Sequence, residues 1–224
     1  MNAGRLAVFD LDGTITRHDT LLPFIFGYLW RHPWRLPRLL AVLRALAAWA
    51  CRRADRGELK GALIRAALGG LLEAQLASWR ERFIAGLLRR GLYAEALLQL
   101  AQQRAVGAHL VLLSASPDLY VKEIGRLLGF DETICTELRW CDDGQLDGRL
   151  RSPNRRGEEK ARCVARLLAT RSYSESIAYG NSSADLAHMA LTSAGVWVNG
   201  RSGAQHPPQV TVERWRLHGG LLIT

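Results

Sequence analysis

The chain has 224 residues, 48% of them hydrophobic, which is enough for one α/β domain with an inserted subdomain and a substantial core. Its formal net charge of +9 at pH 7 favours an anionic partner, such as a phosphorylated substrate, an anionic lipid or a nucleic acid. We expect no nucleic acid, because no binding motif for one is present and the arginines are spread along the chain.

The first predicted element is a buried strand over residues 5–9, which ends in the acidic motif DLDGT at residues 10–14. Asp10 and Asp12 are two residues apart, so in an extended chain both side chains point to the same side. Carboxylates this close repel each other and lose hydration, which a bound cation or a raised pKa of one of them relieves. With Mg²⁺, one Asp could ligate the ion and attack phosphorus while the other moves a proton. The alternative, an ordinary Asp-Gly turn, explains neither the second acid nor the Thr.

Residues 16–90 show no strand pattern, and Leu, Ala and Arg recur there at helical spacing, which predicts a helical cap. Within it, residues 21–50 hold aromatic and aliphatic side chains interrupted by arginines and no acid. Such a helix suits a membrane interface, where Trp and Arg lie among the headgroups. The alternative is a cap helix whose apolar stripe packs inside the domain. Pro33, Pro37 and the arginines interrupt every long apolar window, so no membrane-spanning helix is expected.

A second buried strand is predicted over residues 110–114, followed by Ala115, Ser116 and Pro117. A strand that leads into a helix offers free N–H groups and a positive dipole end to an anion, and the Ser114 hydroxyl adds a donor. The alternative is an ordinary helix that Ser116 caps and Pro117 opens.

A hairpin is predicted over residues 133–150, turning at Asp142-Asp143-Gly144. Next comes a polar stretch at residues 154–160 that enters an apolar-periodic helix, with Lys160 in its first turn. A cation at a helix N-terminus opposes the dipole, so Lys160 is misplaced unless it faces an anion elsewhere. The alternative is an ordinary exposed lysine.

Residues 176–189 again predict a strand, a turn and the start of a helix. This segment contains Asn181 and Asp185, four residues apart. This spacing could place both side-chain oxygens on one side of a tight turn. The alternative is N-capping by Asn181 or Ser182, with Asp185 favourable in the first helical turn. His188 follows closely, and we expect it on the helix surface rather than among ligands.

Together these motifs resemble the haloacid dehalogenase (HAD) superfamily of aspartyl-phosphate phosphatases, and within it the phosphoserine-phosphatase-like branch (subfamily IB). The pattern is a DxDGT strand, a Ser/Thr strand, a Lys and a final acidic loop, and the resemblance spans residues 5 to about 200. It implies an α/β fold with a Rossmann-like parallel sheet and an inserted α-helical cap. The implied domains are a catalytic core at residues 1–15 and 91–200 and a cap at 16–90, with the tail at 201–224 unassigned.

The resemblance also implies site roles. Asp10 is the implied nucleophile, and Asp12 the implied acid that protonates the leaving oxygen and then activates water. The implied phosphate-binding residues are Gly13, Ser114, Ala115 and Lys160, and the implied Mg²⁺ ligands are Asp10, Asp12, Asn181 and Asp185. Asn181 departs from the family pattern, which usually has an Asp there, and the lost charge should weaken Mg²⁺ binding.

We therefore expect a Mg²⁺-dependent phosphomonoester phosphatase, with a lipid or amphiphilic phosphate as the first substrate hypothesis. The cap is similar in character to that of bacterial phosphatidylglycerophosphate phosphatases of the C type, which would bring peripheral contact with an anionic membrane. Alternatives are a phosphatase of a small soluble, phosphoserine-like metabolite and a catalytically weak phosphate- or lipid-binding protein. The four cysteines show no zinc spacing, so we expect free thiols and a cytoplasmic location, peripheral at the inner membrane face under the first hypothesis.

Overall fold

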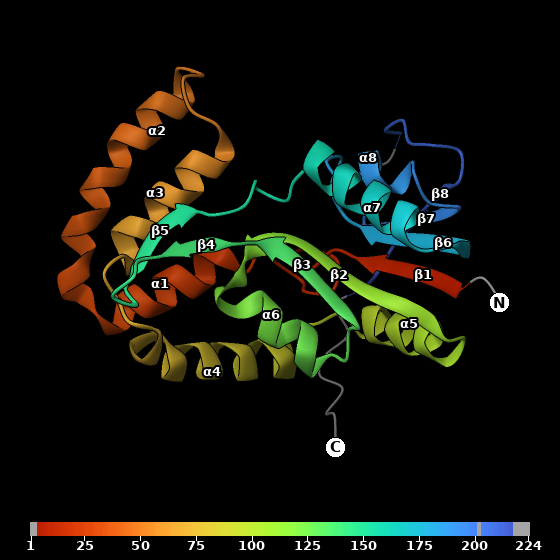
Figure 1. The fold of residues 1–224 in the computed structure, drawn as a ribbon, viewed down its shortest axis with the longest axis horizontal. Coiled ribbons are helices and arrows are strands. Elements are labelled where there is room, and N and C mark those ends of the chain that lie inside the picture. Colours follow the sequence, from red (N-terminus) through yellow and green to blue (C-terminus); the bar gives the residue numbers. More distant parts are fainter. Residues whose placement is uncertain (1–3, 201–202, 217–224) are drawn as a thin grey trace.

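The computed structural model describes residues 4–200 and 203–216, and its centre is a six-stranded parallel sheet of order β3-β2-β1-β6-β7-β8 (Figure 1). The strands are β1 (Gly4–Phe9), β2 (Ala108–Pro117), β3 (Glu132–Thr136), β6 (Tyr173–Gly180), β7 (Ala194–Val198) and β8 (Val210–Glu213). Parallel strands need crossover connections, and each of these contains a helix except the one between β7 and β8, where the described residues form none. The predicted α/β fold with a Rossmann-like sheet is confirmed.

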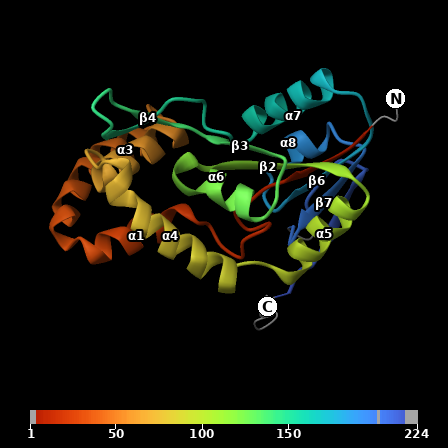
Figure 2. The ribbon, with the colours of Figure 1, turned by 60° about the horizontal axis from the view of Figure 1, so that its bottom comes forward.

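Helices cover both faces of the sheet, so its central strands are apolar on both sides (Figure 2). Alternate residues of β1 point to opposite layers: Phe9 packs with α5 and α6, and Val8 packs with α7 and α8. The helices of these layers are α5 (Ala94–Ala105), α6 (Asp118–Leu127), α7 (Glu158–Thr170) and α8 (Leu186–Met189). This double burial explains why β1 and β2 read as continuous apolar runs rather than alternating ones.

An inserted group of helices extends from one end of the sheet (Figure 1). It consists of α1 (Leu21–Arg31), the 3₁₀ helix η1 (Pro33–Ala41), α2 (Val42–Ala50), α3 (Arg56–Leu68) and α4 (Glu73–Arg90). The entry and exit segments lie side by side, since the Arg17 amide donates to the Gly91 carbonyl at 2.8 Å. No helix in the described part of the chain is long and apolar enough to span a membrane.

The two halves of the apolar segment at residues 21–50 behave differently. In α1 the apolar face is interior, with Phe24, Ile25 and Leu29 buried, and the Trp79 indole donates to the Phe24 carbonyl at 3.1 Å. Neither η1 nor α2 has a buried residue. Buried apolar side chains therefore lie in α1, whereas η1 adds only the half-buried Leu39 to the core.

The predicted hairpin is shorter than expected. Its strands are β4 (Leu138–Trp140) and β5 (Leu146–Leu150), which are antiparallel. Residues 133–136 belong to β3 instead, because that segment pairs with β2 in the main sheet and Ile134 packs on its core. The hairpin packs on α3, where a Cβ at Gly148 would lie 2.6 Å from the Arg65 Cα, so this close approach requires glycine.

The unassigned C-terminal segment contributes the edge strand β8, which pairs in parallel with β7. After it, Trp215 is buried and packs against Tyr93 and Tyr179. The rest of that segment, residues 201–202 and 217–224, lies outside the described residues.

Candidate active site

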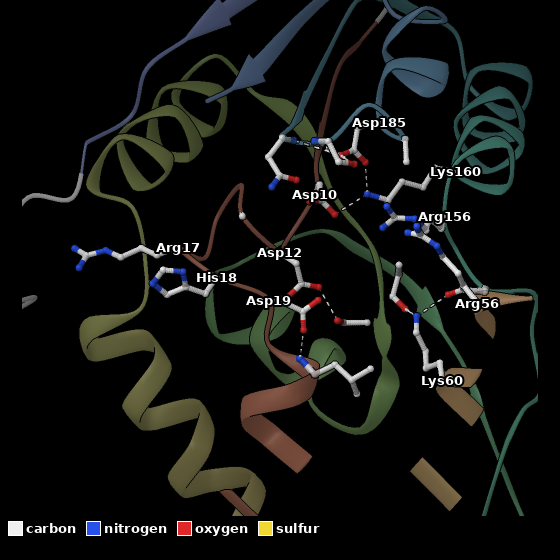
Figure 3. Close-up of a pocket in the computed structure, with 18 residues that line it drawn as sticks. Asp10, Asp12, Arg17, His18, Asp19, Arg56, Lys60, Arg156, Lys160 and Asp185 are labelled. Atoms are coloured by element: carbon white, nitrogen blue, oxygen red, sulfur yellow. Dashed lines mark hydrogen bonds and ion pairs between the residues drawn. The ribbon is translucent and has the colours of Figure 1, made fainter. Parts of the chain in front are cut away.

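A cavity of about 420 Å³ opens at the carboxyl ends of β1, β2 and β6, between the sheet and the inserted helices (Figure 3). Carboxyl ends of parallel strands are the usual ligand-binding edge of an open α/β sheet. Of the predicted site residues, Asp10, Asp12, Gly13, Ala115, Lys160, Asn181 and Asp185 all line this cavity. Residues up to 175 positions apart in the chain are thereby brought together.

At the floor of the cavity a buried ammonium group joins two buried carboxylates. Lys160 Nζ lies 2.6 Å from Asp10 Oδ1 and 2.7 Å from Asp185 Oδ1, and all three side chains are almost fully buried. The positive end of the helix dipole disfavours a cation in the first turn of α7, and the two carboxylates compensate Lys160 for this. Figure 3 shows the three side chains pointing toward one another.

The charges of Asp10, Lys160 and Asp185 shift one another's pKa values. Burial, together with the charges of Asp185 and Asp12, raises the pKa of Asp10 to about 7, although Lys160 opposes the shift. Burial also disfavours the charged forms of Lys160 and Asp185, but their attraction outweighs it. The pKa of Lys160 rises to about 12, and Lys160 and His188 hold the pKa of Asp185 below its usual range.

Asp12 is held in place by hydroxyl groups rather than by a cation. Its Oδ1 accepts hydrogen bonds from the Thr20 amide at 2.8 Å and the Thr20 hydroxyl at 2.6 Å. Its Oδ2 accepts from the Ser116 hydroxyl at 2.6 Å. Burial raises the pKa of Asp12, while these hydrogen bonds partly oppose the shift. A raised pKa favours the protonated form of the carboxyl group, which suits a residue that donates a proton in a reaction.

The turn after Asp10 depends on glycine. Gly13 has φ +77°, and a Cβ there would lie 2.0 Å from the side-chain nitrogen of Asn181. The Asn181 amide group therefore lies directly over the turn that carries both aspartates. Thr14 also supports this turn, because its hydroxyl donates to Asp10 Oδ2 at 3.1 Å.

The two serines near the end of β2 have environments different from those expected. Ser114 is fully buried and does not line the cavity, and its Oγ accepts the Ser116 amide at 3.0 Å. Ser116 lines the cavity and is not a helix cap: α6 has Pro117 at its N-cap position without a side-chain hydrogen bond. The Ser116 hydroxyl is engaged by Asp12 instead, a long-range contact that no local pattern indicates.

His188 is buried rather than on the helix surface. Its Nδ1 lies 4.0 Å from Asp185 Oδ1, and neither ring nitrogen has a hydrogen-bond partner among the described residues. Burial and the Lys160 charge lower its pKa to about 3 although Asp185 opposes the shift, so the ring is neutral. The expectation failed because α8 is a four-residue helix enclosed by α7 and the sheet.

Three cations that the sequence analysis did not single out lie together on one side of the cavity: Arg56, Lys60 and Arg156 (Figure 3). Lys60 Nζ donates to the Ala115 carbonyl at 2.7 Å and to Asn154 Oδ1 at 2.6 Å. Burial lowers the pKa of Lys60 to about 8. No spacing in the sequence marks these residues, because two come from α3 and the third from the loop before α7.

The oxygen atoms at the cavity floor suit a hard cation. No group of three acidic, histidine or cysteine side chains among residues 4–200 and 203–216 is arranged as a metal site. Mg²⁺ often binds through only one or two carboxylates, water and substrate phosphate, so the oxygens of Asp10, Asp185 and Asn181 fit it. Three acids, Asp10, Asp12 and Asp185, also outnumber Lys160 there, which favours an additional positive charge.

Residues 7–190 match the family described as haloacid dehalogenase-like hydrolase, and the chain belongs to this family. It is 35% identical over 195 residues to protein CicA of Caulobacter vibrioides, covering 83% of this chain and 82% of that protein. A Bordetella pertussis protein of unknown function has a similar structure, with TM-score 0.77 and 22% identity, covering 90% of this chain and 93% of that one.

The fold also matches a phosphoserine phosphatase solved as a phospho-aspartyl intermediate analogue. The TM-score is 0.63 at 14% identity, and the match covers 89% of this chain and 88% of that one. The predicted membership of the haloacid dehalogenase superfamily, in the architecture of its phosphoserine-phosphatase-like branch, is confirmed.

Proposed function

We propose that this chain is a Mg²⁺-dependent phosphomonoester phosphatase that works through an aspartyl-phosphate on Asp10. The observation that carries the proposal is the buried Asp10–Lys160–Asp185 arrangement at a cavity floor that Asp12 also lines. A structural neighbour described as a phospho-aspartyl intermediate analogue of phosphoserine phosphatase supports the same chemistry here.

In the first step, an Asp10 carboxylate oxygen forms a bond to phosphorus while the bond to the leaving oxygen breaks. Asp12 donates its proton to that leaving oxygen. In the second step, water attacks the phosphorus, Asp12 takes up the water's proton, and inorganic phosphate leaves with Asp10 regenerated.

Positioning and charge supply most of the rate acceleration in phosphoryl transfer. Lys160 favours the ionised form of Asp10 and offsets phosphate charge, and the hydrogen bonds from Thr20 and Ser116 orient Asp12. The Ala115 amide remains a proposed phosphate donor, whereas Ser114, expected from the resemblance to be another, is fully buried outside the cavity lining. Mg²⁺, held by Asp10, the Asp12 carbonyl, Asn181 and Asp185, would add charge stabilisation and orientation.

The substrate hypothesis we favour is a lipid or amphiphilic phosphate, met at the surface of an anionic membrane. A cavity of about 420 Å³ fits a phosphorylated head group, so acyl chains would remain outside it. A small soluble phosphate is the second candidate, which the polar cavity and its three cations support. The third, a catalytically weak phosphate- or lipid-binding protein, predicts binding without turnover.

A panel of phosphomonoesters assayed with detergent separates these candidates. Soluble aryl phosphate, phosphoserine and phosphatidylglycerophosphate are compared for Mg²⁺-dependent phosphate release. Preference for the lipid supports the first hypothesis, and preference for phosphoserine supports the second. Release from none of them at any Mg²⁺ concentration refutes the phosphatase.

Asn181→Asp is expected to tighten Mg²⁺ about tenfold, because a carboxylate replaces an amide oxygen at a hard-cation site. Mg²⁺ titration by calorimetry and the Mg²⁺ dependence of turnover measure it. Asn154→Asp is the matched control, since it adds the same charge in the same cavity beside Lys60. If both substitutions changed Mg²⁺ affinity equally, Asn181 would not be a Mg²⁺ ligand.

Substrate affinity is expected to fall as the pH rises through about 8, where Lys60 loses its proton. A bound anion favours the protonated amine, so binding raises this pKa and the affinity is fully present only below it. Lys60→Gln should raise KM about tenfold at pH 7 and remove this pH dependence, whereas Lys60→Arg should shift it above pH 10. A KM-against-pH profile unaffected by either change would contradict the assignment.

A further inference from the structure

The end of α1, together with η1 and α2, carries a concentration of exposed apolar side chains. We define the docking face as Trp30, Trp34, Leu36, Leu40, Leu43 and Leu46. Trp30 is 86% exposed, Trp34 70% and Leu40 68%. Most of the exposed large apolar side chains in the described part of the chain lie between residues 22 and 49. These side chains lie on consecutive elements that contact one another, and apolar side chains exposed together mark an interaction site more often than singly scattered ones do.

Contacts of η1 and α2 with α3 keep the side chains of the docking face exposed. Arg35 ties η1 to the end of α3, donating to the Ala67 carbonyl at 2.8 Å and the Gly69 carbonyl at 2.7 Å. One side of α2 packs on α3, while Leu43 and Leu46, one turn apart, remain exposed. The apolar side chains cannot turn inward without dismantling this contact.

The charge around the docking face selects an anionic partner. Between Thr20 and Ala54 the chain has no acidic residue. The same stretch holds the six arginines Arg31, Arg35, Arg38, Arg44, Arg52 and Arg53. Self-association through this face would bring like charges together, because a two-fold interface pairs the same patch with itself. A surface of anionic lipid headgroups complements both the arginines and the tryptophans.

We propose that the docking face binds the protein peripherally to an anionic membrane. The loop after α2 leads to Arg56, which lines the cavity, so the docking face and part of the cavity wall belong to the same inserted group of helices. Lipid turnover at that surface rests on the proposed function, whereas membrane binding does not. The two claims can therefore fail separately.

Co-sedimentation of the full chain with vesicles tests the apolar part. The vesicles contain equal parts of phosphatidylglycerol and phosphatidylcholine. Trp30→Ala/Trp34→Ala and Leu40→Ser/Leu43→Ser should each weaken binding at least about tenfold, because apolar area no longer enters the interface. Leu98→Ser/Leu127→Ser is the matched control, with exposed leucines on α5 and α6, and should bind as the unaltered chain does.

The electrostatic part is tested with charge removal. Arg38→Gln/Arg44→Gln should weaken binding about 30-fold, since each basic residue near an anionic membrane contributes about a fivefold factor. Arg82→Gln/Arg89→Gln removes the same charge from the exposed side of α4 and should have a much smaller effect. Binding should also fall with added salt and on vesicles of phosphatidylcholine alone.

Three results would overturn the proposal. They are no binding to phosphatidylglycerol vesicles, equal losses in the test and control variants, and a dimer in light scattering that the Trp30→Ala/Trp34→Ala change dissociates. Aryl phosphate hydrolysis is measured in parallel on the same preparations. Vesicle binding without hydrolysis supports the docking face and refutes the phosphatase, and hydrolysis without vesicle binding does the reverse.

Discussion

Asp10→Asn is expected to reduce hydrolysis of an aryl phosphate by about four orders of magnitude or more, because the amide cannot form the covalent intermediate. The substitution keeps the size of the side chain, so the fold should persist. Acid quenching of the unaltered enzyme with ³²P-labelled substrate should trap labelled protein, and the variant should trap none. The measurements are phosphate release, trapped label and thermal unfolding.

The matched control for this experiment is Asp142→Asn, which makes the same change at an exposed position in the hairpin turn. It should leave turnover and labelling unchanged. Turnover retained in Asp10→Asn would show that another group attacks phosphorus. Lost turnover together with a lost thermal transition would instead report unfolding, and circular dichroism distinguishes the two.

Lys160→Met is expected to destabilise the metal-free protein by about 3–5 kcal/mol, because it leaves Asp10 and Asp185 buried without their cation. Urea unfolding in the presence of a chelator measures this change. Lys122→Met is the control: its ammonium group also meets two acids, Asp118 and Glu137, but the side chain is 55% exposed. Exposed pairs contribute about 1 kcal/mol or less, so the control should unfold close to the unaltered chain.

The pH dependence of the Lys160→Met penalty has a definite sign. Without the ammonium group, both buried carboxyls should have folded-state pKa values above their unfolded values. The folded state then binds more protons than the unfolded state, so stability falls as the pH rises through this range. The loss relative to the unaltered protein should thus be larger at pH 8 than at pH 5. A loss independent of pH would show that the methionine acts through packing instead.

The acidic turn was predictable because its information is local. Two aspartates two residues apart at the end of an apolar strand converge by backbone geometry alone, whatever the rest of the chain does. Lys160 was predictable for a related reason: its position at a helix start is unfavourable unless an anion compensates it. The sheet followed from apolar runs alternating with helical segments.

Other features depended on contacts that no local pattern encodes. The Ser116 hydroxyl bonds Asp12 from 104 positions away, whereas local rules assign it to a helix N-terminus. The strand at residues 132–136 pairs with the edge of β2 rather than joining the hairpin, because the main sheet satisfies its backbone and Ile134 packs against the core there. His188 became interior because α7 and the sheet enclose its short helix.

By itself, the amino-acid sequence determined which chemical groups this protein places at its strand ends, since side-chain alternation and turn propensity act over a few residues. Only the tertiary structure decided which cations face those groups and which apolar side chains stay exposed. Lys60 reaches the cavity from α3, and most of the large apolar side chains of residues 33–50 stay exposed, although the sequence allowed them to be interior. Burial and long-range pairing are properties of the assembled chain, so they cannot be assigned one segment at a time.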